Sequence, residues 1–315
     1  MRPSLSRLVK VLRPVLAVLV VAALVYAIVT QWAEVRVAIR AIPVSGLALS
    51  TVAVLVGSVT AMLSWRALLA DEGHPLRVVD AGRIFLVGQL GKYLPGSVWS
   101  VVVQMELATR SGVPRARTFT ASLCWIGLTI SSALTVGVIG LPALAAADSS
   151  YTWFLLALVP VALACSLPWV LTRLVNLLLR ALRRAPLPRA LSWRGVGEAF
   201  GWLLATWLCY GVSLWLLADA VGATGWDGFL RCLGGFALAM GAGLVIVVAP
   251  SGAGVREAII VSALAGVMAS GEALGIAVVS RMVFIVTDIA LAGGAALSAW
   301  RLLRRRPTEP APDLH

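Results

Sequence analysis

The sequence predicts an all-α, polytopic membrane protein, and three observations support this. The chain of 315 residues is 60% hydrophobic, with a mean hydropathy of +0.94. Charged residues make up 13% of it, against roughly 25% in soluble domains. The apolar residues gather in stretches near the roughly 20 residues that a helix needs to cross a bilayer. An ordinary soluble domain is therefore excluded.

Six apolar stretches are long enough for full spans, and two more are interrupted. The full spans are predicted at 14–32, 44–65, 118–145, 151–172, 199–220 and 274–300. The interrupted stretches are 82–108 and 229–268, with breaks at Leu94-Pro95-Gly96-Ser97 and at Ala249-Pro250-Ser251-Gly252-Ala253-Gly254. Each break divides its stretch into two half-spans, so each stretch is expected to form a re-entrant helical hairpin.

The positions of charged residues predict how these segments are oriented, because cytoplasmic loops carry an excess of Lys and Arg. Arginines flank the first interrupted stretch on both sides, and acidic residues flank the second. The first hairpin is therefore predicted to open toward the cytoplasm and the second outward. The basic N-terminus 1–13, the Arg-rich linker 173–198 and a disordered tail 303–315 are predicted to be cytoplasmic, around one transmembrane domain at 14–302.

This alternation predicts an inverted repeat, in which residues 44–145 and 199–300 each contain a span, a hairpin and a span. Local parallels support it: Pro95-Gly96 matches Pro250-Ser251, and Ser111-Gly112 matches Ser270-Gly271. The alternative topology is eight ordinary crossings of varied length.

Two hairpins from opposite faces would bring their broken tips together near the bilayer midplane. Non-helical backbone is tolerated at that depth only where protein or a watery cavity satisfies it. Helices restarting after the breaks would present free N–H groups and positive dipole ends, and the glycines would let an anion approach. The uncharged candidates for this cavity are Pro95, Gly96, Ser97, Trp99, Gly252 and Gly254.

Five ionisable residues are predicted to join this cavity: the cations Lys92, Arg256 and Arg281 and the carboxylates Glu257 and Asp288. A charge at such depth costs about 2.5 kcal/mol or more, so it normally pairs or binds something. Three cations beside two helix N-termini suit a phosphate. The alternative is that Arg256 with Glu257, or Arg281 with Asp288 seven residues on, forms an ion pair that only fixes helix packing.

No cofactor, metal or catalytic site is predicted. His74 and His315 are isolated, and the four cysteines lie in apolar stretches without close pairs. The Gly88-x-x-Gly91-Lys92 segment lacks the spacing and the Ser/Thr of a phosphate-binding P-loop. The basic residues lie between spans, which favours anionic lipid headgroups over nucleic acid as partners. An integral-membrane enzyme would need a paired acid and nucleophile within the membrane. The acids Glu106, Glu257 and Asp288 alone do not make such a pair, so no enzymatic activity is expected.

The segments Gly91–Trp99, Gln104–Glu106 and Pro250–Glu257, together with Arg281, resemble the transmembrane region of lysylphosphatidylglycerol synthases. The resemblance covers about residues 14–300, with Ser251 standing where relatives often have glycine. It implies a flippase-like domain that moves aminoacylated phosphatidylglycerol between leaflets, here without the soluble synthase domain. Relatives also accompany polyprenyl-phosphate glycosyl transfer.

The predicted function is therefore transbilayer translocation of a phosphate-bearing lipid, either an aminoacylated phosphatidylglycerol or a polyprenyl-phosphate-linked lipid. The expected location is the cell (plasma) membrane, with both termini cytoplasmic. The alternative is a non-transporting membrane partner or lipid-presenting subunit of a separate synthase or glycosyltransferase, docking through the arginine-rich residues 173–194.

Overall fold

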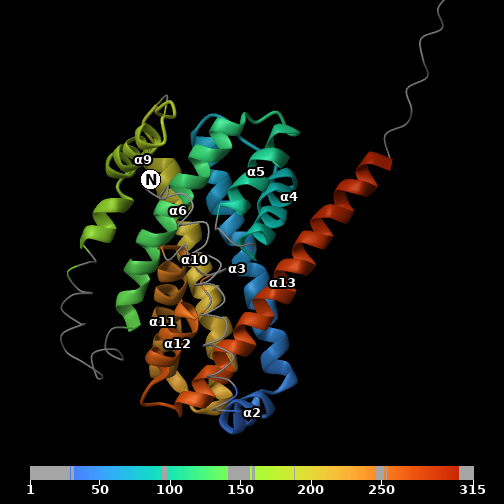
Figure 1. The fold of residues 1–315 in the computed structure, drawn as a ribbon, viewed down its shortest axis with the longest axis vertical. Coiled ribbons are helices and arrows are strands. Elements are labelled where there is room, and N and C mark those ends of the chain that lie inside the picture. Colours follow the sequence, from blue (N-terminus) through green and yellow to red (C-terminus); the bar gives the residue numbers. More distant parts are fainter. Residues whose placement is uncertain are drawn as a thin grey trace, which may run out of the picture.

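The computed structural model describes residues 29, 32–93, 98–140, 157, 160–187, 189–245, 252 and 254–304 (Figure 1). This part of the chain is helical and contains no β-strand, which confirms the predicted all-α fold. The elements are α2 (Trp32–Ala41), α3 (Val44–Asp71), α4 (Val78–Gln89), η1 (Leu90–Tyr93), α5 (Trp99–Thr109), α6 (Arg115–Gly137), η2 (Val138–Gly140), α9 (Pro168–Ala181), α10 (Trp193–Ala218), η3 (Asp219–Val221), α11 (Gly225–Val245), α12 (Val255–Leu264) and α13 (Ser270–Arg304).

Five of the described helices are long and apolar enough to cross a membrane: α3, α6, α10 extended by η3, α11 and α13. A sixth candidate is the bent pair formed by residues Pro160–Ser166 and α9. The predicted spans 44–65, 118–145, 199–220 and 274–300 correspond to α3, α6, α10 and α13. The predicted span 14–32 lies outside the described residues, apart from its last part. The polytopic membrane fold is confirmed.

One predicted span differs from the structure in shape. Residues 151–172 are predicted as one full span, but the described part bends by 81° between Ser166 and Pro168. Leu167 adopts an extended conformation, and Pro168 begins α9. A residue before proline disfavours the helical conformation, which explains a break at this position. Helix α9 then continues to Ala181, so the first part of the predicted linker is helical.

The second interrupted stretch is also less symmetric than predicted. Its first arm, α11, has 21 residues and is long enough to be a span, whereas its second arm, α12, has ten. The reason lies in the position of the proline: no proline occurs between Gly225 and Val245, so nothing in that range interrupts α11. In the first stretch the arms are short on both sides, at 12 and 11 residues.

Helices α3 and α10 pack against each other in antiparallel orientation at the centre of the bundle (Figure 1). Side-chain hydrogen bonds at three levels show which residues of α3 lie opposite which residues of α10. They join Ser50 to Ser213 at 2.8 Å, Thr60 to Thr206 at 2.9 Å, and the Asp71 carboxylate to the Ser192 hydroxyl at 2.5 Å. As residue numbers rise in α3 they fall in α10, so the first helices of the two repeats run in opposite directions.

The remaining packing repeats when α3–α6 are exchanged for α10–α13. Helix α4 packs on α5 as α11 packs on α12, and α6 packs on α11 as α13 packs on α4. The preceding helices obey the same exchange, since α2 packs on α13 and α9 packs on α6. Because the two central helices are antiparallel, this exchange defines an inverted repeat, as predicted.

The two hairpins open at opposite ends of the bundle. In the first hairpin, Gly88 of α4 faces Gln104 of α5, and Gly91 of η1 faces Ser100, so the arms run antiparallel. This hairpin opens at the end of the bundle where α3 ends. There the Arg66 Nε–H donates a hydrogen bond to the carbonyl of Leu76 at 2.7 Å.

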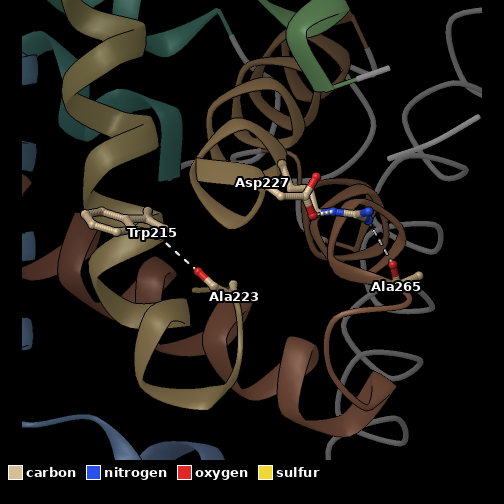
Figure 2. A network of polar contacts seen from close by, with 5 residues as sticks. Trp215, Ala223, Asp227 and Ala265 are labelled. Atoms are coloured by element: carbon tan, nitrogen blue, oxygen red, sulfur yellow. Dashed lines mark hydrogen bonds and ion pairs between the residues drawn. The ribbon is translucent and has the colours of Figure 1, made fainter. Parts of the chain in front are cut away.

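The second hairpin opens at the other end, and Figure 2 shows the polar contacts there. Arg231 of α11 pairs with Asp227 at 2.6 Å and donates to the carbonyl of Ala265, just after α12, at 3.1 Å. The Trp215 indole N–H donates to the carbonyl of Ala223 at 3.1 Å and closes the preceding turn. Both arms of this hairpin therefore enter and leave at one end.

The predicted parallel between Ser111-Gly112 and Ser270-Gly271 is wrong in register. Gly112 lies in the turn before α6 with φ +80°, and the glycine in the corresponding turn before α13 is Gly266, with φ +86°. Ser270 is already the first residue of α13. A positive φ favours glycine, so the turn position and not the Ser-Gly pair is what the repeats share.

We define the basic end of the bundle as the end where residues 72–77, 110–114, 182–187 and 189–192 lie. Glu72, directly after α3, is 8% exposed and accepts a hydrogen bond from the Thr120 hydroxyl at 2.6 Å. Its other oxygen has no hydrogen-bond partner within the described residues. Burial raises the pKa of Glu72 from 4.5 to about 7, against the lowering effects of Thr120 and Arg117.

Glu72→Gln should change how stability depends on pH. The folded protein binds the Glu72 proton more tightly than the unfolded chain does, so stability should fall as pH rises from about 4.5 to about 7 and then level off. The substitution removes this loss, on the order of 3 kcal/mol above pH 7. Thermal melting in detergent micelles across this pH range measures it. Glu106→Gln removes an exposed carboxylate and should keep the wild-type slope; an unchanged slope in Glu72→Gln would contradict the assignment.

Gly211→Ala should destabilise the centre of the bundle. A Cβ at Gly211 would lie 2.8 Å from the Leu233 Cα of α11, so the two helices would have to separate. Overpacking of this kind costs about 1–3 kcal/mol. Gly201→Ala, on the same helix with no atom within 4 Å, is the matched control and should be neutral or slightly stabilising. Equal melting temperatures for the two variants would refute close packing at Gly211.

Candidate functional site

Helix α13 carries two charged residues on one face, and each is met by the tip of a different hairpin. Arg281 and Asp288 are two turns apart, which is about 10 Å along the axis. Helix α13 contacts α4 and η1 of the first hairpin and α12 of the second. The tips of two hairpins that open at opposite ends therefore meet on a short stretch of one helix.

The first hairpin reaches Asp288 through the last two residues of η1. Lys92 Nζ lies 2.7 Å from Asp288 Oδ2, and the Tyr93 hydroxyl donates to the same oxygen at 2.5 Å. The Asp288 residue is 4% exposed, whereas the Lys92 side chain is 24% exposed. The 3₁₀ turn after α4 places these two neighbouring residues against α13. One buried carboxylate oxygen thus accepts from both an ammonium group and a phenol.

The second hairpin reaches Arg281 through the first turn of α12. The Glu257 carboxylate forms an ion pair with Arg281, and its second oxygen accepts from the backbone N–H of Gly254 at 2.7 Å. Gly254 has φ +82°, which suits glycine at the point where the chain turns into α12. Glu257 is 2% exposed. The helix N-terminus predicted to receive an anion therefore holds a carboxylate of its own chain.

Arg256, next to Glu257, lies between two aromatic rings. Its guanidinium is 4.7 Å from the ring centre of Phe236 and 4.6 Å from that of Phe284. It donates to the Ser280 hydroxyl at 3.2 Å, while its Nε has no hydrogen-bond partner in the described part of the chain. The residue is 4% exposed, and Tyr210 packs edge-on against both rings. Cation–π contacts replace part of the hydration of this buried charge.

The site has an uneven charge balance. Two carboxylates face three cations, so one positive charge is left over once each carboxylate is paired. The two breaks, residues 94–97 and 246–253, contain no ionisable residue in the sequence. The ionisable residues of the site therefore carry a net positive charge.

The structure brings together all five predicted ionisable residues, and their ion pairs differ from the two that were considered as the packing alternative. The Arg256 guanidinium bonds to Ser280, not to Glu257. Arg281 pairs with Glu257. Asp288 pairs with Lys92 of the other repeat. Sequence proximity suggested the pairs within one element, whereas the observed pairs join different elements because the hairpin tips insert between the helices.

The structure describes some of the uncharged residues predicted to line the cavity, and others lie outside the described residues. Gly252 has φ +67°, and a Cβ there would lie 2.8 Å from the Cα of Gly243, so glycine is required for close approach to α11. Trp99 begins α5 and is 45% exposed. Pro95, Gly96 and Ser97 lie outside the described residues, as does Pro250.

Four residues at this site were missed by the sequence analysis as site residues: Tyr93, Ser280, Phe236 and Phe284. Tyr93 follows Lys92 directly in the sequence. Phe284 lies between Arg281 and Asp288 on the same face of α13, so helical spacing could have indicated Phe284. No sequence pattern indicates Phe236, which comes from α11.

Another acidic residue, Glu106, lies at the surface. Glu106 pairs with Arg115 at 2.7 Å, and both side chains are more than half exposed. No group of His, Cys, Asp and Glu able to hold a metal ion occurs among the residues that the structure describes.

A double-mutant cycle should expose the coupling between Glu257 and Arg281. Arg281→Gln leaves the buried Glu257 carboxylate without its cation, which costs about 3–5 kcal/mol. Adding Glu257→Gln removes the stranded charge and should recover part of that loss, giving a coupling free energy of about 0.5–3 kcal/mol. Chemical unfolding in micelles measures the four variants.

The exposed pair Glu106–Arg115 provides the matched control for that cycle. Its coupling free energy should be about 0.2–1 kcal/mol, because solvent screens both charges. A coupling at Glu257–Arg281 no larger than at this surface pair would contradict a buried, mutually dependent ion pair.

Comparison with known proteins covers most of the chain. Residues 15–292 match the family model described as the lysylphosphatidylglycerol synthase TM region. No curated protein matches the chain. The matched range includes both hairpins and both ion pairs with α13. This coverage and the helical membrane fold agree with the sequence resemblance, and the chain belongs to the family of the lysylphosphatidylglycerol synthase TM region.

Proposed function

We propose that this protein translocates a phosphate-bearing lipid across the bilayer, with the headgroup passing between the two hairpin tips. One observation carries the proposal: hairpins that open at opposite ends both finish in buried ion pairs on the same face of α13. Discontinuous helices meeting at an inverted-repeat interface are typical of the substrate sites of membrane transporters. Ionisable residues at such depth normally serve a substrate or an ion.

The ion pairs suggest how a phosphate would bind. Lys92 and Arg281 are the more accessible cations, with side chains 24% and 15% exposed. A lipid phosphate would take the place of Asp288 beside Lys92 and of Glu257 beside Arg281. Release of Glu257 would also free the N–H of Gly254 at the start of α12. The displaced carboxylates would balance charge or bind a coupling cation.

Arg256 would act differently from the other two cations. Because it is held between Phe236 and Phe284 and bonded to Ser280, it would stay in place and keep the potential of the site positive. It would also position Glu257, its neighbour in the first turn of α12. Its contribution would be long-range attraction for the phosphate.

The inverted repeat supplies two related states for alternating access. In the described structure, each hairpin packs on the last helix of the other repeat, α4 on α13 and α11 on α6. Rocking one repeat against the other would open the tips first toward one leaflet and then toward the other, with the cations fixed near the centre.

The distribution of charged residues suggests how the protein is oriented in the membrane. Loop arginines collect at the basic end, whereas the turns at the opposite end carry Asp219, Asp227 and Glu272. The positive-inside rule then assigns the basic end to the cytoplasm of the cell membrane, and both termini are proposed to be cytoplasmic as well. Aminoacylated phosphatidylglycerol and polyprenyl-phosphate-linked lipids are the candidate substrates, in keeping with the family. The activity would be transport without chemical conversion, so no enzymatic function is proposed.

Lys92→Gln and Arg281→Gln should each slow lipid translocation by roughly tenfold or more, since one charge-assisted hydrogen bond is worth on the order of 1.5–3 kcal/mol. The assay uses purified protein in liposomes containing labelled phosphatidylglycerol or its lysyl ester, and follows exposure of the label at the outer leaflet. Arg115→Gln, which breaks only a surface ion pair, should translocate at the wild-type rate.

Folded protein must be verified for each variant by gel filtration and melting temperature. Wild-type rates in Lys92→Gln and Arg281→Gln would refute the proposal. Equal loss in Arg115→Gln would show that the assay reports general damage to the protein.

A further inference from the structure

Helix α9 runs in a different direction from the helical segment Pro160–Ser166 that precedes it. The 81° bend between Pro160–Ser166 and α9 turns the chain almost at right angles. Residues 160–166 are apolar and, together with α9, satisfy the length and composition of a span. If the segment before the bend runs along the bundle, α9 runs across it, which is the direction of the membrane surface. In Figure 1, α9 lies at the same end as the tops of α6 and α5.

One face of α9 is buried in the core of the protein. Leu171, Val175 and Leu179 recur every fourth residue and are buried against α6 and the segment that follows α9. That segment is attached to α9 by side chains: Asn176 accepts from the N–H of Leu187 at 2.8 Å, and Thr172 accepts from that of Leu191 at 3.1 Å. Helix α9 is therefore held in a fixed orientation.

A second face of α9 is apolar and exposed. Leu174, Leu177 and Leu178 follow the spacing of neighbours on one helix face and are 46%, 66% and 45% exposed. They point away from the buried face, and the contacts of α9 described above do not cover them. A soluble helix would rarely expose three neighbouring leucines.

The third face of α9 is basic. Arg173 and Arg180 are seven residues apart on one side of the helix, and both are exposed. Arg183 and Arg184 follow in the next turn, and no acidic residue occurs between Pro168 and Gly197. The Arg173 guanidinium lies 5.2 Å from the ring centre of Trp169, an aromatic side chain typical of membrane interfaces.

We propose that α9 is an interfacial helix that binds the anionic lipid surface of the leaflet at the basic end. Its exposed leucines enter the boundary of the acyl chains, and Arg173 and Arg180 contact lipid phosphates. Three features of the structure carry this: the bend, an exposed leucine face, and an adjoining basic face without acids. Amphipathic helices with these features lie in the plane of the membrane, and anionic lipid strengthens their binding. The proposal does not depend on lipid translocation.

Membrane depth of single spin labels tests the orientation. The full-length protein, with its four cysteines replaced by alanine, receives a label at Leu177→Cys or at Arg173→Cys and is placed in phosphatidylglycerol or phosphatidylcholine nanodiscs. Collision with oxygen reports contact with lipid, and collision with a nickel chelate reports contact with water. The Leu177 label should favour oxygen and the Arg173 label should favour nickel, in the same bilayer.

Charge is tested on the Leu177 label with Arg173→Gln/Arg180→Gln. In the parent protein this label should lie deeper in phosphatidylglycerol than in phosphatidylcholine, and the double variant should lose that difference. Arg36→Gln/Arg40→Gln on α2, which occupies the equivalent place in the repeat at the other end, is the matched control and should keep it.

Three results would overturn the proposal. Equal access of nickel to both labels would place α9 in water. Shielding of the Leu177 label from both reagents would mean that protein covers this face, whether another part of this chain or a partner enzyme. A Leu177 depth that is the same in both lipids would leave an interfacial helix without recognition of anionic lipid.

Discussion

The close antiparallel contact between α3 and α10 is the constraint on which the rest of the structure depends. Glycines allow the helices around it to approach, as at Gly211 beside Leu233, and paired hydroxyls such as Ser50 and Ser213 satisfy polar groups without charge. In lipid there is no hydrophobic force between helices, so small residues and hydrogen bonds must supply the attraction. Once these helices are antiparallel, every later element of one repeat faces its inverted counterpart.

This geometry explains why the charges are found on α13. The first hairpin packs on α13, the last helix of the other repeat, along α4, and the second hairpin packs on α13, the last helix of its own repeat, along α12. A buried charge is tolerable only beside its partner, and Lys92 and Glu257 provide one partner each. The equivalent helix α6 carries hydroxyls such as Ser132 and Thr129 at depth instead. The repeat is symmetric in packing and asymmetric in chemistry.

Particular residues show how far sequence reasoning reaches. Prolines and glycines in the sequence predicted the positions of both breaks. The distribution of charged residues predicted that the two hairpins open in opposite directions, and the contacts of Arg66 and Arg231 at opposite ends of the bundle confirm this. The same reasoning missed the bend before Pro168, since the apolar stretch continues through it. It also missed Phe236, because a phenylalanine on an apolar helix looks the same whether it faces lipid or a guanidinium.

The helical membrane fold, the two breaks, the inverted order and the five ionisable residues that come together follow from composition and spacing, because the bilayer imposes a fixed length and a high cost on charge. The partners of those charges do not follow. Arg281 has Asp288 on its own helix face, yet it pairs with Glu257, while Asp288 pairs with Lys92 nearly 200 residues away along the chain. Which side chains come within hydrogen-bonding distance depends on how the hairpin tips insert between helices, and that is a property of the packed bundle.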